Sequence, residues 1–231
     1  MKPTVDPVKV QLLDAILEHV AFDGWSQTAF DAAVADVGLD KAHAQTLCPR
    51  GAVDLAILYH QRGDDAMAAA MAQADLSEMR YSEKVAHAIW LRLEAITDKE
   101  AVRRGTVLFA LPHMAPDGAK LIWGTADRIW TVLGDTSDDI NWYSKRATLS
   151  AVYSSVVLFW LGDMSEDHSA TRAFIDRRID HVMNFEKFKA RVNNNPALKP
   201  ITDPLSRMLG MIKAPNRIPD VDLPGMWRGD T

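Results

Sequence analysis

The sequence predicts an all-α protein built as a bundle of about nine helices, with one further amphipathic helix near its C-terminus. Apolar residues recur at helical spacing along most of the 231 residues, whereas the strict alternation of a strand is hard to find. Asp, Ser, Pro and Gly stand where such helices would begin and end. A hydrophobic fraction of 48% is enough to fill one sizeable core.

Three short helices are predicted first, because each candidate start carries a side chain that caps helix N-termini. These caps are Asp6, Ser26 and Asp40. Pro7 suits the first turn of the first helix, and Gly38 suits the end of the second. The third helix is expected to reach about Leu47, before the break at Pro49.

The later helices are longer. An Ala-rich helix is predicted from Ala52 to about Asp75. Cap residues, prolines and glycines then divide the chain into five more helices: Ser82 to Ile96, Asp98 to the residue before Pro112, Pro116 to Gly134, Ser137 or Asp138 to Gly162, and about Asp167 to Asn193.

One domain with a separate tail is the simplest organisation, since no Gly- or Ser-rich linker divides the first two hundred residues. Within it, residues 1–60 are expected to form a helix-turn-helix-like part and residues 61–192 a second, larger helical part of the same domain. Residues 193–231 form a tail interrupted by prolines.

The layout of the N-terminal part resembles a TetR-type helix-turn-helix domain, which uses such helices to read DNA. DNA binding requires Lys and Arg, however, and residues 1–60 contain four of these against eight Asp and Glu. We therefore expect no nucleic-acid partner. A TetR-type ligand-responsive repressor, the function that this layout would otherwise favour, is kept as an alternative hypothesis.

Several motifs, in order along residues 8 to 190, resemble the coenzyme Q biosynthesis protein nine family. They are Phe22-Asp23-Gly24-Trp25-Ser26, Leu47-Cys48-Pro49-Arg50-Gly51 with Asp54-Leu55, Ala110-Leu111-Pro112, Gly134-Asp135-Thr136-Ser137, and Asp139-Ile140-Asn141-Trp142-Tyr143-Ser144-Lys145-Arg146-Ala147. The resemblance implies a TetR-like fold without DNA binding. It also implies a homodimer that binds an isoprenoid quinone intermediate or phospholipid and presents quinone intermediates to the demethoxyubiquinone hydroxylase.

A lipid pocket requires helices that are apolar on more than one face, and residues 138–162 meet this requirement. The candidate pocket residues are Leu149, Val152, Tyr153, Val156, Val157 and Trp160. A central core helix or a dimer interface would explain the same pattern.

A partner-docking face is predicted at the start of the same helix. Asp139, Trp142, Tyr143 and Arg146 share one helix face, and Trp, Tyr and Arg are frequent in interface hot spots. The resemblance places hydroxylase docking on this motif. The alternative is that both aromatic residues belong to the core and that Asp139 and Arg146 form a surface ion pair.

A membrane-binding helix is predicted at residues 202–213. Residues 184–217 carry seven Lys and Arg against two Asp and Glu, and one helix face there would be apolar. The candidate residues are Leu205, Arg207, Met208, Leu209, Ile212 and Lys213. A helix folded back on the domain, or a disordered basic tail, is the alternative.

No catalytic constellation is found, so we expect neither an enzyme nor a cofactor or metal. The pairs His60 with Asp64 and Glu83 with His87 have one-turn spacing, but two ligands make a weak metal site. A single cysteine, Cys48, indicates a reducing compartment. We therefore expect a cytoplasmic protein that associates peripherally with the inner face of the cytoplasmic membrane.

Overall fold

The structure, a computed structural model, describes the backbone of residues 5–193 and 213–214. Side chains are described for the same residues except 184–193. This part of the chain is all-α, as predicted, with nine α-helices, one short 3-10 helix and no strand. The α-helices are α1 Pro7–Asp23, α2 Gln27–Val37, α3 Lys41–Leu47, α4 Ala52–Gln73, α5 Tyr81–Glu94, α6 Lys99–Ala110, α7 Ala115–Val132, α8 Ile140–Gly162 and α9 Ser169–Asn193.

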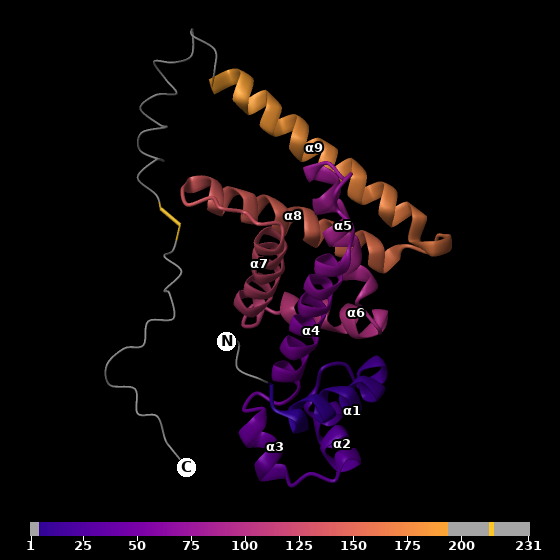
Figure 1. The fold of residues 1–231 in the computed structure, drawn as a ribbon. Coiled ribbons are helices and arrows are strands. Elements are labelled where there is room, and N and C mark those ends of the chain that lie inside the picture. Colours follow the sequence, from indigo (N-terminus) through magenta and orange to yellow (C-terminus); the bar gives the residue numbers. More distant parts are fainter. Residues whose placement is uncertain (1–4, 194–212, 215–231) are drawn as a thin grey trace, which may run out of the picture.

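Helices α1–α3 form one end of the molecule, and the long α4 leads from them into a larger bundle of α4–α9 (Figure 1). Helix α9 lies across the far end of that bundle, where it packs on α5 and α8. Helix α6 packs on both α1 and α7, so it joins the two parts of the molecule.

Most of the predicted caps form. The carboxylates of Asp6, Asp40 and Asp98 and the hydroxyl of Ser26 accept hydrogen bonds from backbone N–H groups in the first turns of α1, α3, α6 and α2. Gly38 ends α2 in the left-handed conformation, with φ of 68°. The capping residues therefore predicted the beginnings of the N-terminal helices correctly.

Three helices begin at other residues than the sequence predicts. Helix α5 begins at Tyr81, one residue before the predicted cap Ser82, because the Glu83 carboxylate accepts a hydrogen bond from the backbone N–H of Arg80. Asp139, not Ser137 or Asp138, caps α8. Helix α9 begins at Ser169, after a 3-10 turn in which Asp167 has φ of 53°.

The apolar residues form two clusters. The first joins α1, α2, α3 and the first half of α4, and the second joins the last part of α4 with α5, α7, α8 and α9. Val102 of α6 packs against both clusters. The boundary between the clusters therefore lies beside α4 and α6.

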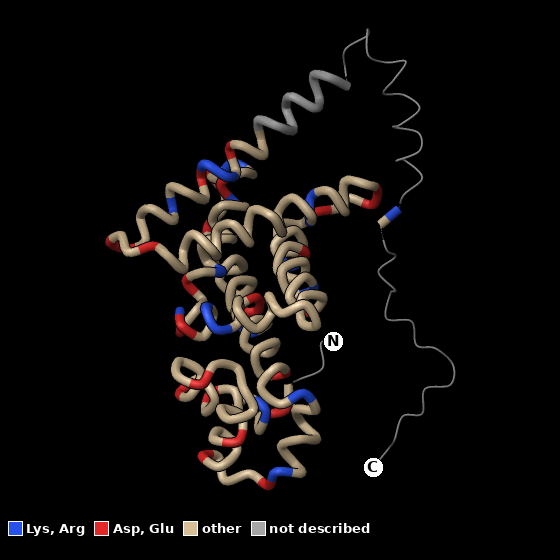
Figure 2. The backbone as a smooth tube through the Cα atoms, turned by 180° about the vertical axis from the view of Figure 1, so that it is seen from behind, with Lys and Arg blue, Asp and Glu red and all other residues tan. Residues whose placement is uncertain are grey.

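Charge is distributed unevenly over the N-terminal end. Figure 2 shows more acidic than basic positions on α1–α3, in agreement with the four cations and eight acids of residues 1–60. None of the described helices combines the length and the apolarity that crossing a bilayer requires.

Candidate functional site

A cavity of about 330 Å³ lies at the boundary between the two apolar clusters. Helices α4, α5, α6, α7 and α8 supply its walls, and Trp25 closes one side from the turn between α1 and α2. The volume is at the lower end of the range for small-molecule sites. Apolar side chains dominate the lining: Ile96, Val102, Phe109, Leu121, Ile122, Val157 and Leu158, together with several alanines.

One part of the wall is polar. The Arg92 side chain of α5 is buried, and its Nε donates to Oδ1 of Asp64 on α4 at 2.6 Å. Nη2 of the same guanidinium donates to the carbonyl oxygen of His60 at 3.0 Å. Gly63 makes this arrangement possible, because a Cβ there would lie 2.6 Å from Cζ of Arg92.

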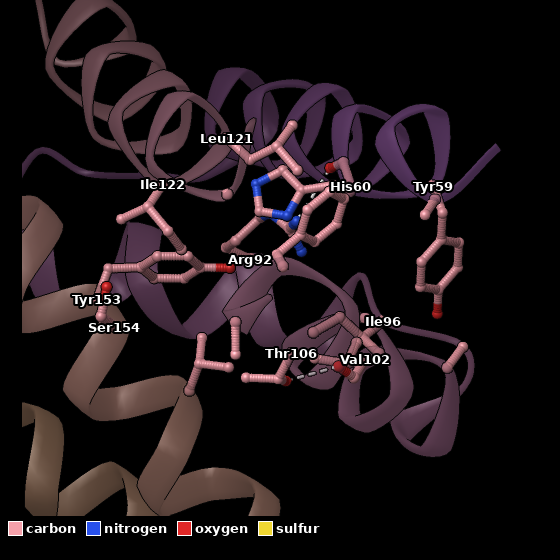
Figure 3. Close-up of a pocket in the computed structure, with 18 of the residues that line it drawn as sticks. Tyr59, His60, Arg92, Ile96, Val102, Thr106, Leu121, Ile122, Tyr153 and Ser154 are labelled. Carbon is pink, nitrogen blue, oxygen red and sulfur yellow. Dashed lines mark hydrogen bonds between the residues drawn. The ribbon is translucent and has the colours of Figure 1, made fainter. Parts of the chain in front are cut away.

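Two more side chains extend this cluster. The hydroxyl of Thr125 on α7 donates to Oδ1 of Asp64 at 2.9 Å and lies 2.8 Å from Nε2 of His60. Figure 3 shows His60, Arg92 and Tyr153 converging from three helices on the same part of the cavity. The four residues His60, Asp64, Arg92 and Thr125 are called the polar cluster below.

Burial controls the protonation of the groups around the cavity. Burial, and then the nearby Arg92 cation, lower the pKa of His60 to about 4, so this imidazole is neutral at pH 7. Burial raises the pKa of Tyr153 to about 12, so its hydroxyl remains a hydrogen-bond donor. The cavity therefore offers hydrogen-bond donors at pH 7, and His60 does not change its protonation state near that pH.

The predicted pocket residues of α8 separate into two groups. Tyr153 and Val157 line the cavity. Leu149, Val152, Val156 and Trp160 are buried in the second apolar cluster and are absent from the lining. Trp160 lies seven positions, or about two helical turns, after Tyr153, so the cavity extends along only part of the buried length of α8.

Sequence analysis missed Arg92, the centre of the polar cluster. The signal was present, because Arg92 follows the apolar residues Val85 and Ile89 at helical spacing and precedes Leu93. An arginine on the apolar face of a helix requires a buried acceptor. His60 and Asp64 were considered only as a metal pair, and no group of three potential metal ligands is found among the described residues.

Glu83 and His87, the other weak candidate pair of metal ligands, do not line this cavity. Both residues line a smaller cavity of about 230 Å³ between α5 and α9, together with Trp90, Arg172 and Asp176. The Arg172 guanidinium stacks on the Trp90 ring at 3.6 Å. Packing between two helices accounts for these contacts.

The predicted docking residues meet at the start of α8. Asp139 caps the helix, and the rings of Trp142 and Tyr143 are half-buried and 4.8 Å apart. The Arg146 side chain is fully buried, with Cζ 4.0 Å from the centre of the Trp142 ring. Trp123 of α7 extends the aromatic group, at 6.0 Å from Trp142.

Arg146 does not pair with Asp139. Its Nε lies 2.6 Å from Asp127 of α7, and its Nη1 lies 3.2 Å from Asp135 in the loop before α8. Burial opposes ionisation of Asp135, but hydrogen bonds from Lys145, Ser137 and Arg146 lower its pKa to about 2. The ion pairs fix the start of α8 against α7.

The predicted membrane residues lie almost wholly outside the described part of the chain. Leu205, Arg207, Met208, Leu209 and Ile212 are not described, and Lys213 is exposed. The next residue, Ala214, donates its backbone N–H to the carbonyl oxygen of Asp138 at 2.8 Å. Residues 213–214 therefore lie beside the start of α8.

Solved structures establish the class of the fold. A TetR transcriptional regulator from Nitrosomonas europaea superposes on 76% of this chain and 98% of its own, with a TM-score of 0.63 and 19% sequence identity. The chain thus has a TetR-regulator-like fold, as predicted. At this identity the likeness concerns the fold alone.

The family comparison is more specific. Residues 115–186 match the family model described as COQ9. A probable ubiquinone biosynthesis protein coq9 of Dictyostelium discoideum is 31% identical over 79% of this chain and 62% of its own length. The ubiquinone biosynthesis protein COQ9 of Homo sapiens is 28% identical over 75% of this chain and 57% of its length. The resemblance to the coenzyme Q biosynthesis protein nine family is confirmed.

The alignments cover about 60% of the length of these curated relatives. The relatives are named as mitochondrial proteins, which contradicts the expected place at the cytoplasmic membrane. That prediction was wrong, because a single cysteine shows only a reducing environment and does not identify the compartment.

Proposed function

We propose that the chain is a non-enzymatic accessory protein of ubiquinone biosynthesis that binds a lipid in the cavity between its two apolar clusters. The cavity itself carries the proposal, because an apolar space lined by five helices matches the chemistry of an isoprenoid or acyl chain. The names of the relatives in Dictyostelium and human supply the pathway. The bound lipid would be an isoprenoid quinone intermediate or a phospholipid.

Presentation of a quinone intermediate to the demethoxyubiquinone hydroxylase is the second part of the proposal. The docking face comprises Asp139, Trp142, Tyr143 and Arg146. Half-buried Trp and Tyr side chains provide a large contact area at low entropic cost. Since α8 carries both this face and the cavity residues Tyr153 and Val157, one rigid helix would connect the lipid to the partner.

The remaining parts of the proposal are the homodimer and a peripheral membrane contact through residues 202–213. Ala214 supports the second of these, because its hydrogen bond to Asp138 would hold the end of that segment beside the docking face. We assign residues 1–60 to scaffolding, residues 61–192 to lipid binding and dimerisation, and the tail 193–231 to the membrane.

A ligand-responsive repressor is the second candidate, favoured by the TetR-like fold. The exposed polar residues of α3, at the position of a recognition helix, are Lys41, His43, Gln45 and Thr46. They include no arginine for bidentate recognition of guanine. The negative charge of residues 1–60 also opposes DNA binding, so the accessory function is preferred.

Lipid extraction and mass spectrometry of the purified protein test the proposal. We expect isoprenoid or phospholipid species to copurify. Val157→Trp places a large ring in the cavity and should reduce the recovered lipid at least tenfold, an effect of roughly 1.4 kcal/mol or more. Ala151→Trp is the matched control, because Ala151 is an exposed residue of the same helix and does not line the cavity. Equal recovery from both variants would contradict the assignment.

A further inference from the structure

Two hydrogen-bond donors of the cavity wall have no partner among the described residues. Tyr153 is only 2% exposed, and its hydroxyl makes no hydrogen bond to the described side chains, those of residues 5–183 and 213–214, or to the described backbone. Arg92 uses Nε and Nη2 on Asp64 and His60, and its Nη1 makes no hydrogen bond in the same part of the chain. Both residues line the cavity, so an occupant with an acceptor oxygen would satisfy donors that the protein itself leaves unpaired.

The two donors lie close together. Cζ of Arg92 is 6.0 Å from the centre of the Tyr153 ring. In Figure 3 the Tyr153 hydroxyl is directed toward Arg92 and His60, at the polar side of an otherwise apolar space. A single small polar group in the cavity would therefore meet donors from α5 and α8.

The charge at this end of the cavity is already balanced. Arg92 pairs with Asp64 at 2.6 Å, and Arg62, the other arginine of the lining, pairs with Asp14 on α1. His60 is neutral at pH 7. An incoming carboxylate or phosphate would thus add an uncompensated negative charge beside Asp64, which is costly in a buried site.

We propose that the Tyr153 hydroxyl and Nη1 of Arg92 bind the oxygen of an uncharged lipid head group, a hydroxyl or a carbonyl, and that the polar cluster excludes anionic head groups. This assignment rests on the proposed lipid-binding function. It makes Tyr153 and Arg92 the residues that select a neutral amphiphile over a fatty acid or a lipid phosphate, so of the two candidate lipids it favours the isoprenoid quinone intermediate over the phospholipid.

Calorimetric titration of the full chain, freed of lipid, with octan-1-ol, octanoate and toluene at pH 7.5 tests the proposal. We expect octanol to bind at least tenfold more tightly than octanoate, although the chains have the same number of carbons. Tyr153→Phe should weaken octanol binding roughly threefold to tenfold, as expected for one neutral hydrogen bond, and leave toluene binding unchanged.

Tyr59→Phe is the matched control. Tyr59 also lines the cavity, but its hydroxyl is already engaged at 3.1 Å with the backbone carbonyl and N–H of Asp98. Its removal should leave the ratio of octanol to toluene affinity unchanged.

The outcomes separate this proposal from the proposed function. Stronger binding of octanoate, or a Tyr153→Phe protein that binds octanol as the parent does, overturns the head-group assignment while toluene binding preserves the cavity. If none of the three compounds binds, both the head-group assignment and the lipid site are wrong.

Discussion

Arg146 contributes to the proposed docking face from beneath it. Its side chain has no exposed surface, so it cannot itself touch a partner in the described arrangement. Ion pairs with Asp127 and Asp135 hold the guanidinium, and the guanidinium supports the ring of Trp142 at 4.0 Å. Any partner contact of this proposed docking face therefore depends on Trp142 and Tyr143.

Trp142→Lys should abolish coprecipitation with the hydroxylase, since loss of an aromatic hot spot costs about 2 kcal/mol or more. The inserted cation would also lie against the Arg146 guanidinium, so the helical circular dichroism of the variant must be measured alongside. Ala147→Lys is the control, because Ala147 is an exposed residue five positions further along α8. Retained coprecipitation by a folded Trp142→Lys protein would show that the face does not dock.

His60 should make stability depend on pH. Its pKa is lowered in the folded protein from 6.5 to about 4, so between these values the unfolded state binds the proton and the folded state does not. The stability due to the neutral ring is complete above pH 6.5 and falls as the pH decreases toward 4. The shift corresponds to about 3 kcal/mol, at 1.36 kcal/mol for each pH unit.

Urea denaturation at pH 7.5 and pH 4 measures this effect. The free energy of unfolding of the parent chain should decrease, relative to that of His60→Gln, by about 3 kcal/mol between the two pH values. The glutamine variant cannot titrate, so it corrects for the other ionisable groups. Parallel pH dependences for the two proteins would show that folding does not lower the pKa of His60.

At the scale of elements, sequence predicted the helices well because their ends are local. Caps such as Asp6, Ser26 and Asp40 act within one turn, so they can be found without knowledge of the tertiary structure. Ser82 failed because Arg80 and Glu83 form a competing capping arrangement. A single cap contributes only about 0.5–2 kcal/mol, so neighbouring candidates compete closely.

The candidate site was less predictable than the helices. Trp25, Arg92 and Tyr153 are far apart in the sequence, and only the packing of α4, α5, α6 and α8 brings them to one cavity. The apolar pattern of α8 shows that the helix is buried on several faces, but it does not distinguish a cavity wall from a filled core. This is why only Tyr153 and Val157 of the predicted pocket residues line the cavity.

The contact between α6 and α7 offers a matched pair of glycines. A Cβ at Gly118 would lie 2.9 Å from Cβ of Phe109 and 3.3 Å from its carbonyl oxygen, so Gly118→Ala must push the helices apart. We expect a loss of about 1–3 kcal/mol in the free energy of unfolding. Gly124→Ala, on the same helix with nothing within 4 Å, should instead gain up to about 1 kcal/mol. Equal effects in thermal or urea denaturation would contradict this close approach.

At the scale of the whole molecule, the fold joins a helix-turn-helix-like end to a cavity. Trp25 connects the two, because its indole N–H donates to the carbonyl oxygen of Ala101 on α6 at 3.0 Å while its ring lines the cavity. Arg104 of α6 likewise donates to the carbonyl oxygen of Ala21 at 2.9 Å. These bonds fix the N-terminal end to the cavity wall, which gives α1–α3 a structural role that does not require DNA.

The negative charge of the N-terminal end predicts that it does not bind DNA. Affinity for duplex DNA comes largely from counterions released when Lys and Arg neutralise phosphates, and a protein without a basic face lacks this term. Residues 1–60 have a formal charge of minus four, from four cations and eight acids, and Figure 2 shows no basic stripe across α1–α3. We therefore expect no binding of a mixed-sequence duplex by fluorescence anisotropy at 10 μM protein and 150 mM salt, where nonspecific binders have dissociation constants of about 10⁻⁴–10⁻⁶ M. Binding that weakens linearly with the logarithm of the salt concentration would instead support the repressor.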